Sequence, residues 1–411
     1  MHPPAALTGA LTLIARAPDL WPGFAPQRTP LLTFDGTHSW LHHAGPGEDG
    51  WTRVDGAWVW PDRHPALTAH TAVTLPGGLD AAGVLLPDLP LPGDPAQAAR
   101  TLAATLIHEA FHVYQGATPS PAWPAPELTA LTYPAGAEVR HARAEETHWL
   151  RLALHARDGD WLTPARHALH WRTERHARMD AEHQSFETRM ETTEGLAQYV
   201  ETRFLGEHPN LDPDAAPQQT PRFWSYRSGA ALAHLLDRTG TPWTAGVLAG
   251  RPLADLLTDL LTGQVGSPLP APPHPQLQRA AQAAADAHDA DLRARLEAFH
   301  AQPGPTLHLS SAAGLRLGGF DPMNLHPVEP GTFLHARHVQ VRGPGAQLLT
   351  VGHPALTRGP DLFRVQEITL RALPTPHHEA GRWRVHTPTL TLDLPADAVQ
   401  VTPDGWSVRL P

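Results

Sequence analysis

The residues of this sequence best placed to do chemistry together are His108, Glu109 and His112, in the segment HEAFH. Residues four apart share one face of a helix, so the two histidines can each direct an imidazole nitrogen at one tetrahedral zinc ion. Glu109 is adjacent to both and can accept the proton of a water molecule that the metal acidifies. The pattern predicts one zinc ion per chain, with Glu109 as the general base.

The segment around HEAFH has the signals of a helix. Asp94 followed by Pro95 is typical of an N-cap and a first turn, and the apolar residues beyond it recur at helical spacing, which predicts a helix over residues 95–115. Leu106 and Phe111 would help to bury the site. The chain has 28 histidines, so the alternative at this point is a helix whose histidines are only polar surface groups.

Two histidines leave a catalytic zinc ion one protein ligand short. A third histidine six residues after the second would stand at position 118, which is Thr118. The other common solution is a glutamate on a separate helix, and residues 191–201 (ETTEGLAQYVE) offer Glu191, Glu194 and Glu201. We favour Glu194, because Gly195 inside a helical pattern costs roughly 1 kcal/mol relative to alanine and indicates close packing beside the site. Glu191 could instead orient a zinc-binding histidine, and the alternative for either glutamate is an exposed helix carboxylate.

Three segments together resemble the gluzincin metallopeptidases, in which two histidines and a glutamate hold zinc. They are HEAFHVYQ, EGLAQY at 194–199 and YRSGAALAHLLD at 226–237, and the resemblance covers roughly residues 70–240. It implies hydrolysis of peptide bonds, with a peptide or protein as the substrate. Its Tyr-x-x-Gly helix implies that Tyr226 contributes to the reaction centre, together with the ligands His108, His112 and Glu194 and the base Glu109.

Two departures from that family concern the class of peptidase. The gap between His112 and Glu194 is far longer than in the family's aminopeptidases, and their Gly-x-Met-Glu-Asn segment is absent. Both argue against an aminopeptidase role. Tyr226 is the expected hydrogen-bond donor to the oxyanion, with Tyr199 as the alternative, although a core tyrosine with a satisfied hydroxyl is the better reading of Tyr199.

The elements that position these residues predict an α+β fold. Residues 28–92 alternate between strand and turn patterns, the centre of the chain has helical periodicity, and strand patterns return from Gly304. Two long helices are expected over 137–206, interrupted near 158–160 and again at Pro164. The chain is divided into an N-terminal β lobe, a helical zinc lobe and a C-terminal β-rich domain, at residues 1–93, 94–302 and 303–411.

Charge and composition exclude several classes of protein. The formal net charge is -10 and no basic run is present, so no nucleic-acid partner is expected. No stretch approaches 18 uninterrupted apolar residues, and the N-terminus lacks a basic segment and a cleavage site, so no membrane association is expected. The absence of cysteine leaves metal binding to His, Asp and Glu and suits a reducing, cytoplasmic location.

Other interpretations remain open at this level. One is a zinc hydrolase that cleaves an amide other than a peptide. Another is a non-catalytic scaffold or binding protein with a structural zinc ion, which would need neither a general base nor an oxyanion donor. A strand at 69–76 or 81–87, just before the zinc helix, could bind an extended substrate by edge pairing, unless it is an internal strand of the β lobe.

Overall fold

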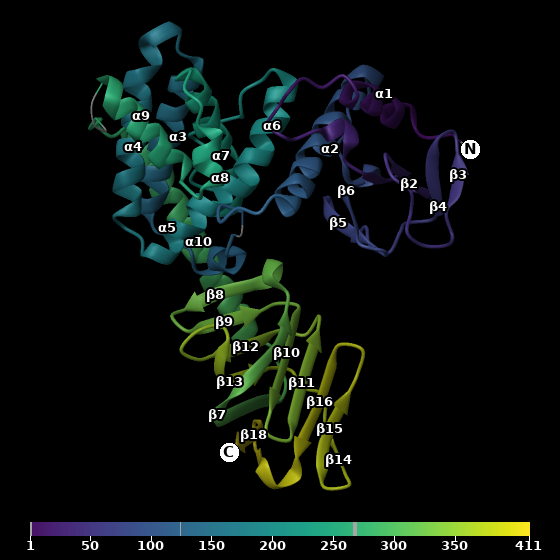
Figure 1. The fold of residues 1–411 in the computed structure, drawn as a ribbon. Coiled ribbons are helices and arrows are strands. Elements are labelled where there is room, and N and C mark those ends of the chain that lie inside the picture. The colour runs from purple at the N-terminus through teal and green to yellow at the C-terminus, as the bar shows by residue number, and fades with distance from the viewer. Residues whose placement is uncertain (1, 124, 266–268) are drawn as a thin grey trace. The chain divides into compact units, whose positions relative to one another are not determined.

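A computed structural model of the chain describes residues 2–123, 125–265 and 269–411 (Figure 1). It contains a small N-terminal sheet, a helical middle region and a large C-terminal sheet, which confirms the predicted α+β class. Within the described residues, no helix combines the length and the apolar composition that crossing a membrane requires.

Internal contacts divide the chain into two compact units. Unit 1 comprises Met1–Ala130 and Gly136–Gln282, and unit 2 comprises Leu131–Ala135 and Ala283–Pro411. The segment 1–93 of the sequence analysis and most of residues 94–282 therefore lie in unit 1, while residues 131–135 and 283–302 lie in unit 2. The small sheet and the central helices share unit 1 because one helix, described below, packs against both of them.

The small sheet of unit 1 has the strand order β3-β4-β2-β1-β6-β5. Strands β1 and β6 are parallel, and the other pairs are antiparallel. Asp55 and Gly56 both have positive φ (46° and 87°) at the turn between β3 and β4, as a tight hairpin requires. The strands are β1 (Leu31–Phe34), β2 (His38–His42), β3 (Thr52–Val54), β4 (Ala57–Pro61), β5 (Thr71–Leu75) and β6 (Leu79–Leu85).

Helix α2 (Pro95–Ala117) connects this sheet with the helical part of unit 1. The side chain of Asp94 accepts a hydrogen bond from the backbone N–H of Gln97, so the predicted N-cap is present. The helix ends two residues beyond the predicted limit. Its contacts with β6 and with the helix at 196–205 make it the element around which the core of unit 1 is built.

The apolar N-terminal segment folds as helix α1 (Ala5–Ile14), which packs on α2. A Cβ atom at Gly9 would lie 2.7 Å from the Cβ of Ala99, so only glycine permits this approach. Leu7 and Ile14 are completely buried there. The segment is thus part of the core of unit 1.

Residues 137–206 form more helices than the sequence analysis predicted. The break near 158–160 is present, but Pro164 lies in the first turn of its helix, where the missing N–H breaks no hydrogen bond. A second break falls at 177–180, where Asp180 caps the next helix. The helices are α3 (Ala137–His155), α4 (Leu162–His176), α5 (Ala181–Met190), a five-residue π-helix (Glu191–Gly195) and α6 (Leu196–Leu205).

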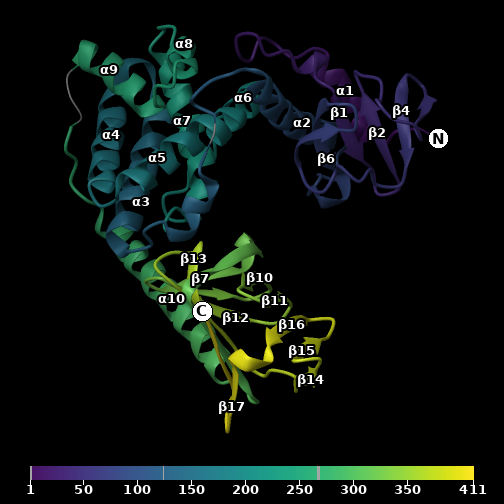
Figure 2. The ribbon, with the colours of Figure 1, turned by 60° about the horizontal axis from the view of Figure 1, so that its bottom comes forward.

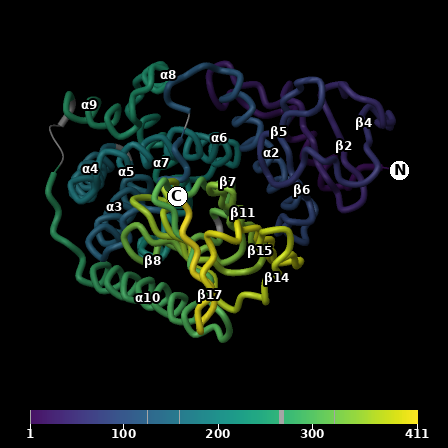
Figure 3. Tube along the Cα trace, turned by 90° about the horizontal axis from the view of Figure 1, so that it is seen from below, coloured from purple at the N-terminus to yellow at the C-terminus, as the bar shows by residue number. Residues whose placement is uncertain are grey.

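Unit 1 is completed by helices that follow the proline-rich stretch. They are α7 (Pro221–Arg238), α8 (Thr244–Leu248) and α9 (Leu253–Val265). Helix α10 (Pro275–His300) then begins in unit 1 and continues into unit 2 as one helix (Figure 3).

Unit 2 is built on a large sheet (Figure 2). Its strand order is β14-β15-β16-β11-β10-β7-β13-β12-β9-β8, while β18 pairs with β17 and β7. Its apolar residues form a core of their own. The strands are β7 (Thr306–Phe320), β8 (Leu325–Glu329), β9 (Thr332–His335), β10 (His338–Gly343), β11 (Ala346–Val351), β12 (Ala355–Arg358), β13 (Arg364–Leu370), β14 (His377–Glu379), β15 (Arg382–His386), β16 (Leu390–Pro395), β17 (Val399–Thr402) and β18 (Gly405–Leu410).

Candidate metal centre

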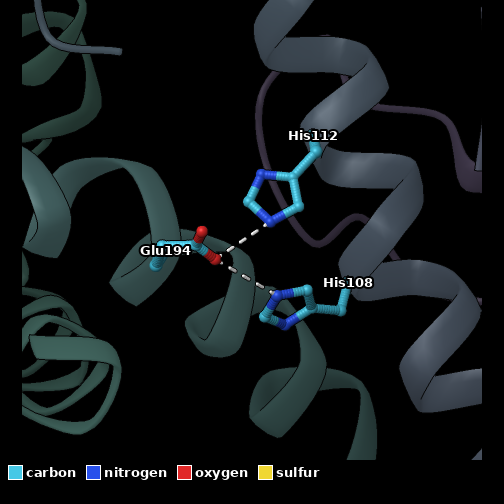
Figure 4. A group of neighbouring side chains, drawn as sticks. All are labelled: His108, His112 and Glu194. Atoms are coloured by element: carbon cyan, nitrogen blue, oxygen red, sulfur yellow. Dashed lines mark ion pairs between the residues drawn. The ribbon is translucent and has the colours of Figure 1, made fainter. Parts of the chain in front are cut away.

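Helix α2 and the π-helix bring together the three residues expected to bind a metal ion. His108 and His112 extend from α2 toward Glu194, which projects from the π-helix (Figure 4). One ligand atom from each residue can be chosen so that all three lie within 4.8 Å of one another. His108 and Glu194 are buried and His112 is partly buried, so the group has the spacing and the shielding of a metal site.

Close backbone packing holds the π-helix in place. A Cβ atom at Gly195 would lie 2.6 Å from the Cα of Gly229 on α7, and a Cβ at Gly229 would lie 2.6 Å from the carbonyl oxygen of Glu191. Neither position has room for a side chain. The close packing that Gly195 predicted is therefore confirmed, and α7 is the element that supplies the opposing surface.

Buried ion pairs anchor the first residue of the π-helix. Both carboxylate oxygens of Glu191 accept hydrogen bonds from Arg172, and Ser228 donates a third at 2.6 Å. Arg172 also donates to Glu146 at 3.0 Å. Glu191 therefore ties the π-helix to α3, α4 and α7, rather than orienting a histidine as the sequence analysis suggested.

Hydrogen bonds fix which ring nitrogen of each histidine faces Glu194. Nδ1 of His108 lies 3.0 Å from Oε2 of Glu201, and Nδ1 of His112 lies 2.7 Å from Oε1 of Gln115. A carboxylate and an amide oxygen can only accept, so both Nδ1 atoms carry the proton when the rings are neutral. Each Nε2 then presents a lone pair, 3.7 Å (His108) and 3.2 Å (His112) from Oε2 of Glu194.

Of the residues that orient the ligands, the sequence analysis considered Glu201 only as a possible third ligand and did not consider Gln115. Gln115 follows His112 by three residues and His108 by seven, and this helical spacing was a signal that could have identified it. Glu201 follows Glu194 by seven residues and so shares its side of a helix. Glu201 contacts Nδ1 of His108, whereas Glu194 faces Nε2 of the same ring.

The donor atoms of this group fit a metal ion. Oε2 of Glu194 is buried and receives no hydrogen bond from any residue that the structure describes. When the rings are neutral, two imidazole lone pairs and one carboxylate oxygen converge on one point, and a buried group of this kind requires a proton or a metal ion between its members. The His108, His112 and Glu194 group can therefore hold a metal ion.

The electrostatics of the group also favour a cation. Burial lowers the pKa of His108, but the carboxylates of Glu194 and Glu201 outweigh it and raise the pKa to about 10. Burial raises the pKa of Glu194, yet contacts with the two histidines hold it well below its usual range. The same field attracts a proton or a metal ion, so metal binding should release protons.

Arg222 and Tyr226 of α7 complete the other side of the group. Arg222 donates to Oε1 of Glu194 at 3.0 Å, which leaves Oε2 to face the histidines, and its other nitrogen lies 3.1 Å from Glu127. The ring of Tyr226 stacks on His108 with centroids 5.8 Å apart. Burial and the neighbouring carboxylate of Glu194 raise the pKa of Tyr226, so its hydroxyl keeps its proton.

Tyr199, the alternative donor, lies in the core. Its side chain is 1% exposed, its hydroxyl donates to Asp237 at 2.6 Å, and it accepts from Arg203 at 3.0 Å. With both functions of the hydroxyl already used, Tyr199 is the satisfied core tyrosine that the sequence analysis preferred.

Glu109 lies beside the two histidines on α2, and its side chain is largely buried. Burial raises its pKa, and the histidines oppose part of that rise. Its Oε2 atom has no hydrogen-bond partner within the described ranges. One carboxylate oxygen is thus available to accept a hydrogen bond next to the metal-ligand group.

Comparison with protein-family models, with curated proteins and with solved structures finds no match for this chain. The chemistry of the site must therefore be inferred from its own atoms.

Proposed function

We propose that the chain is a zinc-dependent metallopeptidase that hydrolyses peptide bonds, with Glu109 as the general base. The observation that carries the proposal is the buried Oε2 of Glu109, which lacks a partner among the described residues and adjoins the His108, His112 and Glu194 group. A purely structural metal site requires no such acceptor. The combination of three ligands and an adjacent unpaired base is instead typical of metal-assisted hydrolysis.

Zinc is the metal that this ligand set favours. Two imidazoles and one carboxylate form a common three-residue set for catalytic zinc, which leaves one position for water or substrate. A bound zinc ion supplies a Lewis acid, which polarises the scissile carbonyl and lowers the pKa of water.

Glu109 and Tyr226 would then divide the proton chemistry between them. Glu109 accepts a proton from the attacking water and delivers it to the leaving amine. Tyr226 retains its proton, because of its burial and the nearby carboxylate of Glu194. Its hydroxyl accepts from Arg222 at 3.4 Å and hydrogen-bonds Glu194. It would turn from Glu194 to donate to the oxyanion, a contact whose removal typically costs ~10²–10³ in turnover.

The small sheet offers a place for an extended substrate. Of the two strands considered in the sequence analysis, β6 lies between β1 and β5, whereas β5 is the last strand at its end of the described sheet. Strand β5 also contacts α2, the helix that carries both histidines. The outer edge of β5 is thus suited to pair with the backbone of a peptide, and this supports a peptide over a smaller amide as the substrate.

Hydrolysis of an unstructured, fluorogenically labelled protein tests the proposal. Glu109→Gln should keep the metal content of the wild type but lose about 10²–10⁴ in kcat, the usual contribution of a general acid–base group. Glu174→Gln, at an exposed glutamate on α4 that pairs with Arg178, is the matched control and should leave the rate unchanged. A Glu109→Gln variant with the wild-type rate would refute the assignment of the base.

A further inference from the structure

We infer that Gln115 is a positioning residue of the metal centre: its amide is held in one orientation by the π-helix and thereby fixes the ring nitrogen that His112 presents to the metal. The inference rests on the metal-binding part of the proposed function. It does not depend on the reaction that follows.

The orientation of the Gln115 amide is set by two backbone carbonyls. Its Nε2 group lies 2.9 Å from the carbonyl oxygen of Thr193 and 3.3 Å from that of Thr192, both in the π-helix. Carbonyl oxygens only accept hydrogen bonds, so the NH₂ end of the amide must face them. The oxygen end is left facing His112, 2.7 Å from its Nδ1.

This orientation determines the state of the His112 ring. An amide oxygen requires a proton on Nδ1, so the neutral ring carries its lone pair on Nε2. That atom faces Oε2 of Glu194 at 3.2 Å, on the side where the metal ion would lie. The other tautomer would turn an N–H toward the ion and abolish ligation.

The same side chain joins the two elements that carry the ligands. Gln115 belongs to α2, and its bonds reach the residues just before Glu194 in the π-helix. Gln115 is 4% exposed, so water does not compete freely for these bonds. One residue therefore sets both the tautomer of His112 and the separation between α2 and the segment that bears Glu194.

Gln184 on α5 provides a matched comparison. Its Nε2 also donates to two backbone carbonyls, those of His176 at 2.8 Å and Met179 at 3.1 Å. Its side chain has no hydrogen bond to a metal-ligand residue in the described structure. Gln184 therefore makes the same amide-to-carbonyl hydrogen bonds as Gln115, but it makes no contact that orients a metal ligand.

The experiment measures zinc affinity by competition with a chromogenic chelator in full-length Gln115→Leu, Gln115→Glu and Gln184→Leu, beside the wild type. Leucine removes both polar ends of the amide, so Gln115→Leu should lower the affinity by about 10–100-fold, as loss of a residue that orients a metal ligand usually does. A buried glutamate beside two carbonyl oxygens takes up a proton, so its O–H can donate to the carbonyl of Thr193 while its other oxygen faces Nδ1 of His112, and Gln115→Glu should recover most of that loss. The visible absorption of the cobalt-substituted protein should change in Gln115→Leu and be restored in Gln115→Glu.

Gln184→Leu should bind zinc as the wild type does, with only its resistance to urea reduced. The inference is overturned by a wild-type affinity in Gln115→Leu, by a Gln115→Glu affinity as low as that of Gln115→Leu, or by an equal loss in Gln184→Leu. If the variants show the expected order of zinc affinities but the wild type cleaves no peptide, the proposed function is refuted and the role of Gln115 stands. A wild type that binds no zinc would refute both.

Discussion

Replacing Gly229 with alanine would displace the segment that carries Glu194. The added Cβ would lie 2.8 Å from the Cα of Glu191 and 2.6 Å from its carbonyl oxygen. Carbon atoms reach their optimal separation at about 3.5–4.0 Å, so the π-helix or α7 must move by about 0.7 Å or more. Distances between a metal and its ligands tolerate only about 0.2 Å, so Glu194 cannot follow this shift and still ligate well.

The expected cost of Gly229→Ala is that of overpacking a core, roughly 1–3 kcal/mol. If this strain destabilises the zinc-bound form and not the metal-free form, zinc affinity should decrease by roughly 5–150-fold. Chelator competition measures the affinity, and urea denaturation of the metal-free protein measures the remaining loss of stability. Gly263→Ala, at an exposed helical glycine with open space around its Cβ position, is the control and should leave affinity unchanged. Gly229→Ala with the affinity and stability of the wild type would refute the close packing of α7 on the π-helix.

Two further substitutions test the packing that supports each unit. Arg172→Met leaves the buried carboxylates of Glu146 and Glu191 without this partner, so it should lower the free energy of unfolding by about 3–5 kcal/mol in urea denaturation. The control Arg251→Met removes an exposed pair with Asp259 and should cost at most about 1 kcal/mol. Equal costs in the two variants would contradict the buried ion-pair network. In unit 2, burial and, to a smaller extent, His338 lower the pKa of His335 to about 4. Only the unfolded state then takes up a proton between pH 6.5 and about 4, so stability is complete above that range and falls by about 3 kcal/mol across it. Burial also lowers the pKa values of His42 and His234 to about 4, so His335→Gln should reduce, not abolish, the slope of unfolding stability in this range. An unchanged slope would show that His335 does not contribute to it.

Local sequence signals predicted the parts of the site that a single helix determines. Asp94 and Pro95 specified where α2 begins, and the spacing of His108 and His112 then placed two imidazoles on one face. The α+β class followed from the change between strand and helix periodicity along the chain. These features depend on residues within a few turns of one another, which is why one sequence sufficed.

The roles of the glutamates depended on tertiary packing instead. Glu191 and Glu194 are three residues apart and would lie near each other on a regular helix, so periodicity cannot decide which one reaches the histidines. The π-helix and the buried bonds from Arg172 and Ser228 separate their directions. Such a decision requires partners from α4 and α7, which no local pattern reveals.

Elemental analysis of zinc is the measurement that tests the central claim most directly. Wild type and Glu194→Gln would be stripped with a chelator, loaded with zinc, and freed of excess metal before counting ions per chain. Because His108, His112 and Glu194 supply the ligand atoms of the group among the described residues, we predict about one zinc ion per chain in the wild type and a loss of most of it in Glu194→Gln. Little zinc in the wild type, or equal zinc in the two proteins, would contradict the account.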